Sequence, residues 1–301
     1  MPFSLYPDNR KKKRSLPRRF PVIFPLVVFI LILIGYQISE KTYNKPSIGV
    51  VELNGIILES ETIIKKLRIL ESNPLVKGII IHINSPGGAV APSQEIFTEI
   101  LRIRQFKKVY ASIASTAVSG GYYVAIGADK IYANPGSMVG SIGAIIQTFN
   151  FEELLNKIGI KSEVIKSGKN KDMGSIFRPI ESEERKLLES VIFDTHDQFV
   201  TAIADRRPME LEEVKSIADG RVFTGRQAKQ IGLVDQLASF RETAEELRKN
   251  LGIKEEMSLV YTPDKEKLIE SIIELDSVSI LKKISSQMGL FYLTTSFLEK
   301  Q

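Results

Sequence analysis

Short continuous apolar runs, which are typical of buried strands, recur along this chain between segments whose apolar residues follow helical spacing. The runs predict strands at residues 48–53, 78–83, 109–114 and Lys130–Ala133. The segments around them predict helices at residues 60–70, 92–106, 119–126 and 151–158. Because predicted strands and helices alternate, the sequence indicates an α/β fold with right-handed β-α-β crossovers.

The C-terminal part of the chain is expected to be mostly helical. Its apolar spacing predicts a long amphipathic helix over residues 181–206, a second from about 208 to 220, and a short one at 227–231. Further on, spaced apolar positions predict one or two surface helices that close the domain or contact another copy. These positions are Leu268, Ile272, Ile273, Ile280, Leu281, Ile284, Met288 and Leu290.

Residues 20–39 form a long stretch without a charged side chain. As a helix this stretch is about 30 Å long, which matches the hydrocarbon core of a bilayer. Seven basic residues precede it, so we expect a membrane anchor with a cytoplasmic N-terminus and an exported remainder. A cleaved signal peptide is the alternative, but no clear small-x-small cleavage site follows the stretch.

Composition narrows the classes of function. The 301-residue chain has no cysteine, which excludes disulfides, thiol catalysis and cysteine-ligated metals. The net charge is +5, but residues 1–19 hold seven basic residues and one acidic residue, or +6, which leaves −1 for the rest. Because a nucleic-acid surface needs basic charge on the folded part, we expect no nucleic-acid partner. That part is roughly 255 residues long, enough for one large domain or two small ones.

A run of small residues places Ser119 between a predicted strand and a predicted helix, directly before Gly120 and Gly121. Small neighbours permit the sharp turn and the close substrate approach that a nucleophilic serine needs. The amides at the start of the helix would also face the site. A serine in this place is equally a common helix N-cap, so the motif alone leaves both interpretations open.

Lysines and histidines compete as the base for such a serine. A lysine base must be neutral near pH 7 although its ordinary pKa is about 10.4, and burial lowers that pKa. Lys171 is the preferred candidate, with Lys166 and Lys169 as alternatives in the same segment. His82 alternates with isoleucines on a predicted strand, which favours a packed residue. His196 lies in a predicted amphipathic helix, which favours a surface residue.

The segment Asn84-Ser85-Pro86-Gly87-Gly88 follows a predicted buried strand and leads into a helix. Its glycine pair can present backbone N–H groups to a developing oxyanion. A plain strand-to-helix turn and a phosphate-binding turn are alternatives. The segment lacks the lysine of a Walker loop and the spacing of a dinucleotide fingerprint, which disfavours nucleotide binding.

Five sequence blocks, in order, resemble the signal peptide peptidase A family in its short, single-domain bacterial form. The resemblance runs from about residue 48 to residue 237. Its blocks are residues 84–88, 119–123, 140–143, 168–172 and 218–235.

This resemblance implies a serine endopeptidase with a Ser–Lys dyad that degrades remnant signal peptides after preprotein processing. It implies that Ser119 is the nucleophile, that Lys171 is the general base, and that Ser141 hydrogen-bonds and orients the lysine. No metal or cofactor is implied, and the block at residues 218–235 is expected to serve packing and subunit contacts. The expected oxyanion-hole amides are those of Gly87, Gly88 and Gly120.

The implied fold is a crotonase- or Clp-protease-like β-β-α spiral. Short family members form dome-shaped rings, octameric where known, in which neighbouring subunits can share an active site. We therefore expect a homo-oligomeric ring in the plasma membrane, with the catalytic domain on the extracytoplasmic side and extended apolar peptides as substrates. The expected organisation is a basic tail (1–19), a transmembrane helix (20–39), a linker (40–47), a protease domain (48–240) and a C-terminal helical extension (241–301).

Three other functions remain open from the sequence. A related membrane protease acting on specific membrane or misfolded proteins would need the same residues. A crotonase-type acyl-CoA enzyme would share the fold, but would need neither Ser119 nor Lys171 and no anchor. An inactive scaffold would not need an intact dyad.

Overall fold

The computed structural model describes residues 25, 27–29, 45–254, 258–262 and 291–293. The chain divides into two compact units, residues 1–45 and 46–301, and the second contains the sheet. In the described part of the chain, no helix is both long and apolar enough to cross a membrane. The predicted span at residues 20–39 lies outside the described residues, except for helical positions 25 and 27–29. The apolar positions predicted as helices between 264 and 290 also lie outside them.

One sheet contains eight of the described strands, in the order β7-β6-β4-β2-β1-β9, with β5 also paired to β4 and β8 paired to β5. The pairs β1–β2, β2–β4, β4–β5 and β4–β6 are parallel, and β6–β7 is antiparallel. A separate pair joins β3 and β10. The strands are β1 Ser47–Asn54, β2 Val76–Ser85, β3 Gly87–Ala89, β4 Lys108–Val118, β5 Lys130–Ala133, β6 Met138–Gly140, β7 Val222–Thr224, β8 Gln236–Leu237, β9 Ser258–Tyr261 and β10 Phe291–Leu293.

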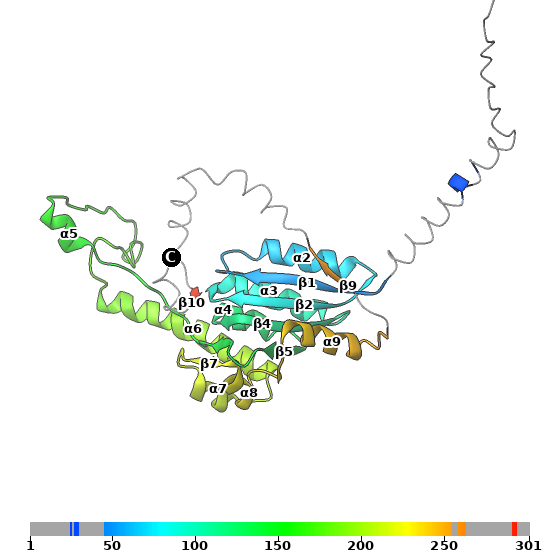
Figure 1. The fold of residues 1–301 in the computed structure, drawn as a ribbon. Coiled ribbons are helices and arrows are strands. Elements are labelled where there is room, and N and C mark those ends of the chain that lie inside the picture. The colour runs from blue at the N-terminus through cyan, green and yellow to red at the C-terminus, as the bar shows by residue number, and fades with distance from the viewer. Residues whose placement is uncertain (1–24, 26, 30–44, 255–257, 263–290, 294–301) are drawn as a thin grey trace, which may run out of the picture. The chain divides into compact units, whose positions relative to one another are not determined.

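Helices connect most of the parallel strands, and α2 and α9 lie on opposite sides of the sheet (Figure 1). This arrangement is the α/β fold that the alternating pattern predicts. The described helices are α2 Glu61–Ser72, α3 Val90–Ile103, α4 Gly120–Ala125, α5 Glu152–Lys157, α6 Ser182–Arg206, α7 Leu211–Ile217, α8 Gly225–Gln230 and α9 Phe240–Asn250.

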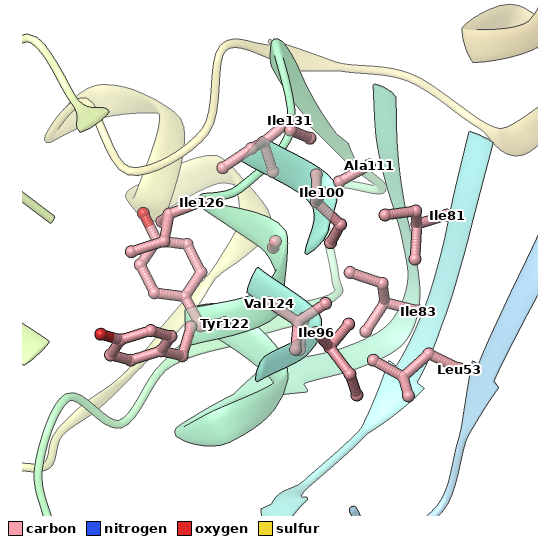
Figure 2. Packing of buried hydrophobic residues seen from close by; sticks show 14 of the residues in the cluster. Leu53, Ile81, Ile83, Ile96, Ile100, Ala111, Tyr122, Val124, Ile126 and Ile131 are labelled. Atoms are coloured by element: carbon pink, nitrogen blue, oxygen red, sulfur yellow. The ribbon is translucent and has the colours of Figure 1, made fainter. Parts of the chain in front are cut away.

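Alternation along β2 divides the core between the two faces, because successive side chains of a strand point to opposite sides. Ile81 and Ile83 belong to the larger cluster, which α2, α3 and α4 cover. Figure 2 shows Tyr122 and Val124 of α4 packed in this cluster. Ile80 points the other way, into a smaller cluster under α9. Each fully buried aliphatic side chain contributes about 1.5–3 kcal/mol, so α4 is fixed on a rigid sheet.

Strand β4 is longer than its apolar run predicts, and this difference defines the site. The run predicts an end at Ala114, but β4 continues to Val118. Its last three residues, Thr116, Ala117 and Val118, pair with Met138, Val139 and Gly140 of β6. Partners distant in sequence thus extend the strand through polar positions, and Ser119 becomes the first residue after it.

Candidate active site

Ser119 forms the junction between β4 and α4 and has a backbone conformation that L-residues rarely adopt. Its φ is 54° and its ψ is −123°. Its N–H donates to the carbonyl oxygen of Gly140 at 2.7 Å, and its own carbonyl oxygen accepts from the amides of Tyr122 and Tyr123. A strained turn that is fixed on both sides places the serine side chain at the end of the sheet, as in a nucleophile elbow.

Ser141 occupies the equivalent position after the neighbouring strand β6. Its φ is 51°, and its N–H donates to the carbonyl oxygen of Arg221 at 2.8 Å. Within the described residues, Ser119 and Ser141 are the two non-glycine positions with positive φ. Because Val118 pairs with Gly140, the two serines follow adjacent strands in register.

The hydroxyl of Ser119 is buried and has no hydrogen-bond partner in the described structure. Its side chain makes no N-cap hydrogen bond to α4, so the N-cap explanation for this serine fails. An unsatisfied buried hydroxyl on a strained residue costs stability, and such costs are typical of functional sites.

Glycines bring the segment 85–88 close to the Ser119 turn and to Ile57. A Cβ on Gly121 would lie 2.7 Å from the carbonyl oxygen of Ser85. A Cβ on Gly88 would lie 2.0 Å from the carbonyl oxygen of Ile57, so only glycine fits there. The close approach explains the glycines physically and places β3 beside the start of α4.

The backbone amides near Ser119 differ in their availability. The Gly87 N–H donates to the Ser85 hydroxyl at 3.1 Å and is therefore occupied in this structure. The Gly87 carbonyl and the Ala89 amide both bond to Ile57. Since backbone groups alternate along a strand, the Gly88 amide points to the opposite edge of β3. No acceptor is assigned to the Gly120 amide among the described residues, as expected for the first residue of a helix.

The edge of β3 that faces away from Ile57 is paired with a strand from the C-terminal region of the same chain. Residues Phe291–Leu293 (β10) run antiparallel to Gly87–Ala89, with Tyr292 opposite Gly88. Strand β10 also contacts α4, which begins at Gly120. This edge therefore accepts an extended peptide next to Ser119.

The histidines lie away from this edge. His82 stacks edge-on against Phe240 of α9 with ring centroids 4.7 Å apart, and burial lowers its pKa. Thus His82 lies on the α9 face, whereas α4 covers the opposite face. His196 is half-buried, and its Nε2 bonds to the carbonyl oxygen of Ala218 at 2.8 Å, a structural contact rather than the surface position that the sequence favours.

Lys171 lies in the segment between β6 and α6, which also carries α5. Figure 1 shows α5 and the first turns of α6 extending beyond the sheet, and α5 contains no buried residue. Lys171 is exposed, and its ammonium has no hydrogen-bond or ion-pair partner in the described part of the chain. The structure therefore joins Ser119, Ser141 and the glycines, but it makes no hydrogen bond between Lys171 and Ser119 within one chain.

Comparisons with known proteins place this arrangement in a family. Residues 102–254 match the model of peptidase family S49, and residues 37–149 match the Clp protease model. A "Putative protease" of Synechocystis sp. is 40% identical over 201 residues, which cover 66% of this chain and 72% of that protein. A "Putative signal peptide peptidase SppA" of Enterococcus faecium is 35% identical over 246 residues, 76% of this chain and 72% of that protein. "Protease 4" of Salmonella typhi is 30% identical over 249 residues, 79% of this chain and 40% of that protein.

The family model covers half of the chain, and two of these relatives are matched over more than two thirds of their length. The α/β sheet also agrees with the Clp protease match. Neither an acyl-CoA enzyme nor an inactive scaffold fits these matches. The chain therefore belongs to peptidase family S49 and is a serine peptidase.

Proposed function

We propose that this peptidase is anchored in a membrane by residues 20–39 and hydrolyses extended apolar peptides, in particular remnant signal peptides. Ser119 is the nucleophile and Lys171 the general base. The observation that carries this proposal is the buried, unpartnered Oγ of Ser119 on a strained turn beside a strand edge that pairs with an extended segment.

The geometry supports a conventional acyl-transfer sequence. Neutral Lys171 takes the proton from the Ser119 hydroxyl while Oγ attacks the peptide carbonyl carbon. The Gly88 and Gly120 amides stabilise the oxyanion. The C–N bond breaks as Lys171 returns the proton to the leaving amine, and water then hydrolyses the acyl ester. Ser141, on the adjacent strand end, orients the lysine.

Because Lys171 is exposed and makes no hydrogen bond to Ser119 within one chain, we infer that the base comes from a second copy of the chain. The segment that carries Lys171 also exposes many apolar side chains, which on a stable protein mark an interaction surface. The first half of α6 continues this surface. The exposed apolar residues are Phe149, Phe151, Leu154, Ile158, Ile160, Val164, Ile165, Phe177, Leu187, Val191 and Phe193. A ring of copies would bury these residues and bring each Lys171 to a neighbouring Ser119.

An apolar, extended substrate agrees with both the β3 edge and the proposed membrane anchor. Pairing along β3 needs only the peptide backbone, so recognition tolerates varied side chains. An anchor at residues 20–39 would keep the site near peptides that remain in the bilayer. The name of the Enterococcus faecium relative, a signal peptide peptidase, supports the same substrate class.

The test uses the full chain in detergent with a fluorogenic peptide taken from the apolar core of a signal sequence. Wild type should cleave it, and Ser119→Ala and Lys171→Ala should not. Lys161→Ala, which removes another exposed lysine of the same segment, should remain active. Activity of Ser119→Ala would refute the nucleophile. Equal cleavage of an unfolded polar protein would favour the broader protease that acts on misfolded proteins.

A further inference from the structure

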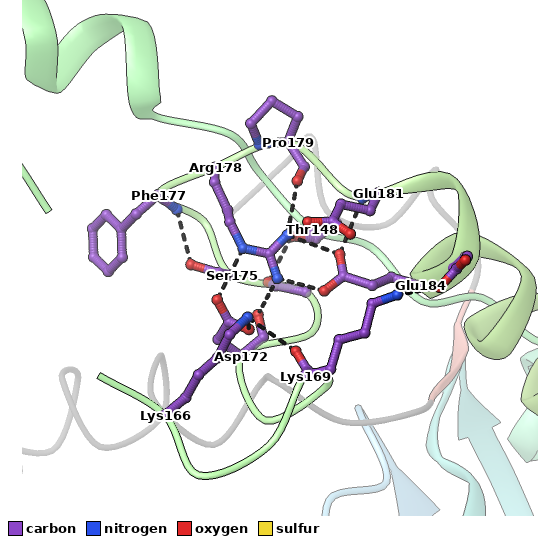
Figure 3. A network of polar contacts seen from close by, with 12 residues as sticks. Thr148, Lys166, Lys169, Asp172, Ser175, Phe177, Arg178, Pro179, Glu181 and Glu184 are labelled. Atoms are coloured by element: carbon purple, nitrogen blue, oxygen red, sulfur yellow. Dashed lines mark hydrogen bonds and ion pairs between the residues drawn. The ribbon is translucent and has the colours of Figure 1, made fainter. Parts of the chain in front are cut away.

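Arg178 is the centre of a network of charged side chains that surrounds the Lys171 segment (Figure 3). Its Nε donates to Asp172 Oδ2 at 2.9 Å, and its Nη1 donates to Glu184 Oε2 at 2.8 Å. Its Nη2 donates to the other oxygen of Glu184 and, at 3.3 Å, to the backbone carbonyl of Asp172. One guanidinium thus connects two carboxylates, and the Glu184 contact is bidentate.

Asp172 directly follows Lys171, so this network acts on the backbone that carries the base. The Lys171 N–H donates to the Gly168 carbonyl at 3.1 Å, and the Ser175 N–H donates to the Asp172 carbonyl at 3.0 Å. Lys166 ion-pairs with the second carboxylate oxygen of Asp172. The turn around Lys171 is therefore held mainly by the contacts of Asp172.

Glu184 supplies the fixed end of the network. It is 1% exposed and lies in the first turn of α6, where its Oε2 also accepts from the Glu181 N–H at 3.0 Å. Glu181 and Glu184 together form a capping box, which fixes the start of the helix. Through Arg178, the otherwise exposed Lys171 turn is attached to a long helix.

The network also compensates the negative charge of Asp172, the residue next to Lys171. An unpaired carboxylate at position 172 would favour the protonated form of Lys171, which cannot act as a base. Arg178 and Lys166 compensate that charge, and both hold the pKa of Asp172 far below its usual range. Arg178 lowers the pKa of Glu184 to about 2, so its carboxylate stays charged. The other charged groups between β6 and the second turn of α6 are Glu152, Glu153, Lys157, Lys161, Glu163, Lys169, Glu181, Glu183, Arg185 and Lys186, with Lys169 paired to Glu183.

We propose that Arg178 and Glu184 are positioning residues for Lys171: they fix its turn on α6 and balance the charge of Asp172. This inference rests on the proposed role of Lys171 as the base. It assigns a function to two residues that the sequence motifs do not single out.

The test compares full-length Arg178→Gln, Glu184→Gln and Arg178→Lys with wild type, using signal-peptide hydrolysis against pH. Arg178→Gln removes a positive charge, so the pH at which activity rises should increase by about half a unit. Glu184→Gln removes a negative charge but keeps an oxygen for the helix cap, so that pH should decrease by about as much. Both should lower kcat roughly tenfold with little change in KM. Arg178→Lys should restore the wild-type pH profile but not the full kcat, because lysine cannot bridge both carboxylates.

Arg185→Gln is the matched control, since it removes a positive charge next to Glu184 from a side chain outside the network. It should change kcat by less than about twofold. The positioning role would be overturned if Lys171→Ala is inactive but the pH at which activity rises shifts in the same direction in Arg178→Gln and Glu184→Gln. It would also be overturned if both of these variants keep the wild-type kcat. If Lys171→Ala is itself active, the proposed base is wrong instead. If Arg178→Gln does not fold, the pH shift in Glu184→Gln and the pH profile of Arg178→Lys still test the positioning role.

Discussion

Ser119 and Ser141 follow neighbouring parallel strands in register, and both have positive φ although neither is glycine. The Ser119 amide donates to the carbonyl of Gly140, the residue directly before Ser141. Two strained serines at adjacent strand ends cost stability that glycine would not. Such a cost is retained where the side chains are needed, which supports a joint role at the site.

The first prediction separates the chemistry of Ser119 from its strain. Ser119→Ala should reduce kcat/KM at least about a thousandfold, while thermal unfolding changes little because Oγ has no partner to lose. Ser119→Gly should be equally inactive but about 1 kcal/mol more stable than Ser119→Ala, because glycine tolerates the φ of 54°. Activity assays and urea unfolding of the two variants check this. An alanine variant as stable as the glycine variant would argue against strain at this position.

A second prediction concerns the exposed position of Lys171. If each site combines Ser119 of one copy with Lys171 of another, two inactive variants should complement each other. Ser119→Ala and Lys171→Ala, dissociated, mixed in equal amounts and reassembled, should recover about a quarter of wild-type activity, since random neighbours pair both intact residues at that frequency. A double variant mixed with Ser119→Ala provides the control without complementation. No recovery in verified mixed assemblies would place both residues of the dyad in one chain.

The sequence predicts the central strands well, because their apolar runs are covered on both faces and need no information from distant partners. The junction at Ser119 is harder to predict. Strand β4 extends past Ala114 because β6 pairs with residues 116–118 and Ser85 of β2 pairs with Ala117, and β6 itself has three residues. The small residues around Ser119 are compatible with a sharp turn, but the positive φ of Ser119 and Ser141 accompanies hydrogen bonds to Gly140 and Arg221 that the local pattern does not specify.

Helix α9 is hard to predict from the sequence for a different reason. Phe240–Asn250 falls in the region where a C-terminal helical extension is expected, but it is strongly polar, and its few apolar residues, which include the buried Leu247, give no clear helical run that would define its bounds. A capping box at Ser239 and Glu242 was the available signal. The Arg178 network has a similar signal, since its Glu184 is the N3 residue of the α6 capping box. The contact between Arg178 and Asp172 depends on a chain reversal that the sequence does not specify.

A third prediction tests the packing role expected for the block at residues 218–235. Arg207 is nearly buried and bonds both oxygens of Asp235, which also accepts from the Ile131 N–H of β5. Arg207→Met should lower the free energy of unfolding by about 2–3 kcal/mol, because it leaves Asp235 partly unpaired. Arg221→Met, which breaks the exposed pair with Asp219, should cost less than about 0.5 kcal/mol. Equal costs in urea unfolding would contradict the structural distinction between the two pairs.

The last prediction concerns strand β10, which lies on the edge of β3 where we expect the substrate to bind. A segment of the same chain competes at a high effective concentration, so its removal should help a peptide to bind. A chain that ends after residue 290 should therefore have a KM for the signal-sequence peptide at least about threefold lower, with kcat unchanged. A chain that ends after residue 293 keeps β10 and serves as the control. A synthetic peptide of residues 288–295 should inhibit the shorter chain competitively. An unchanged KM together with no inhibition would mean that substrates do not use the β3 edge.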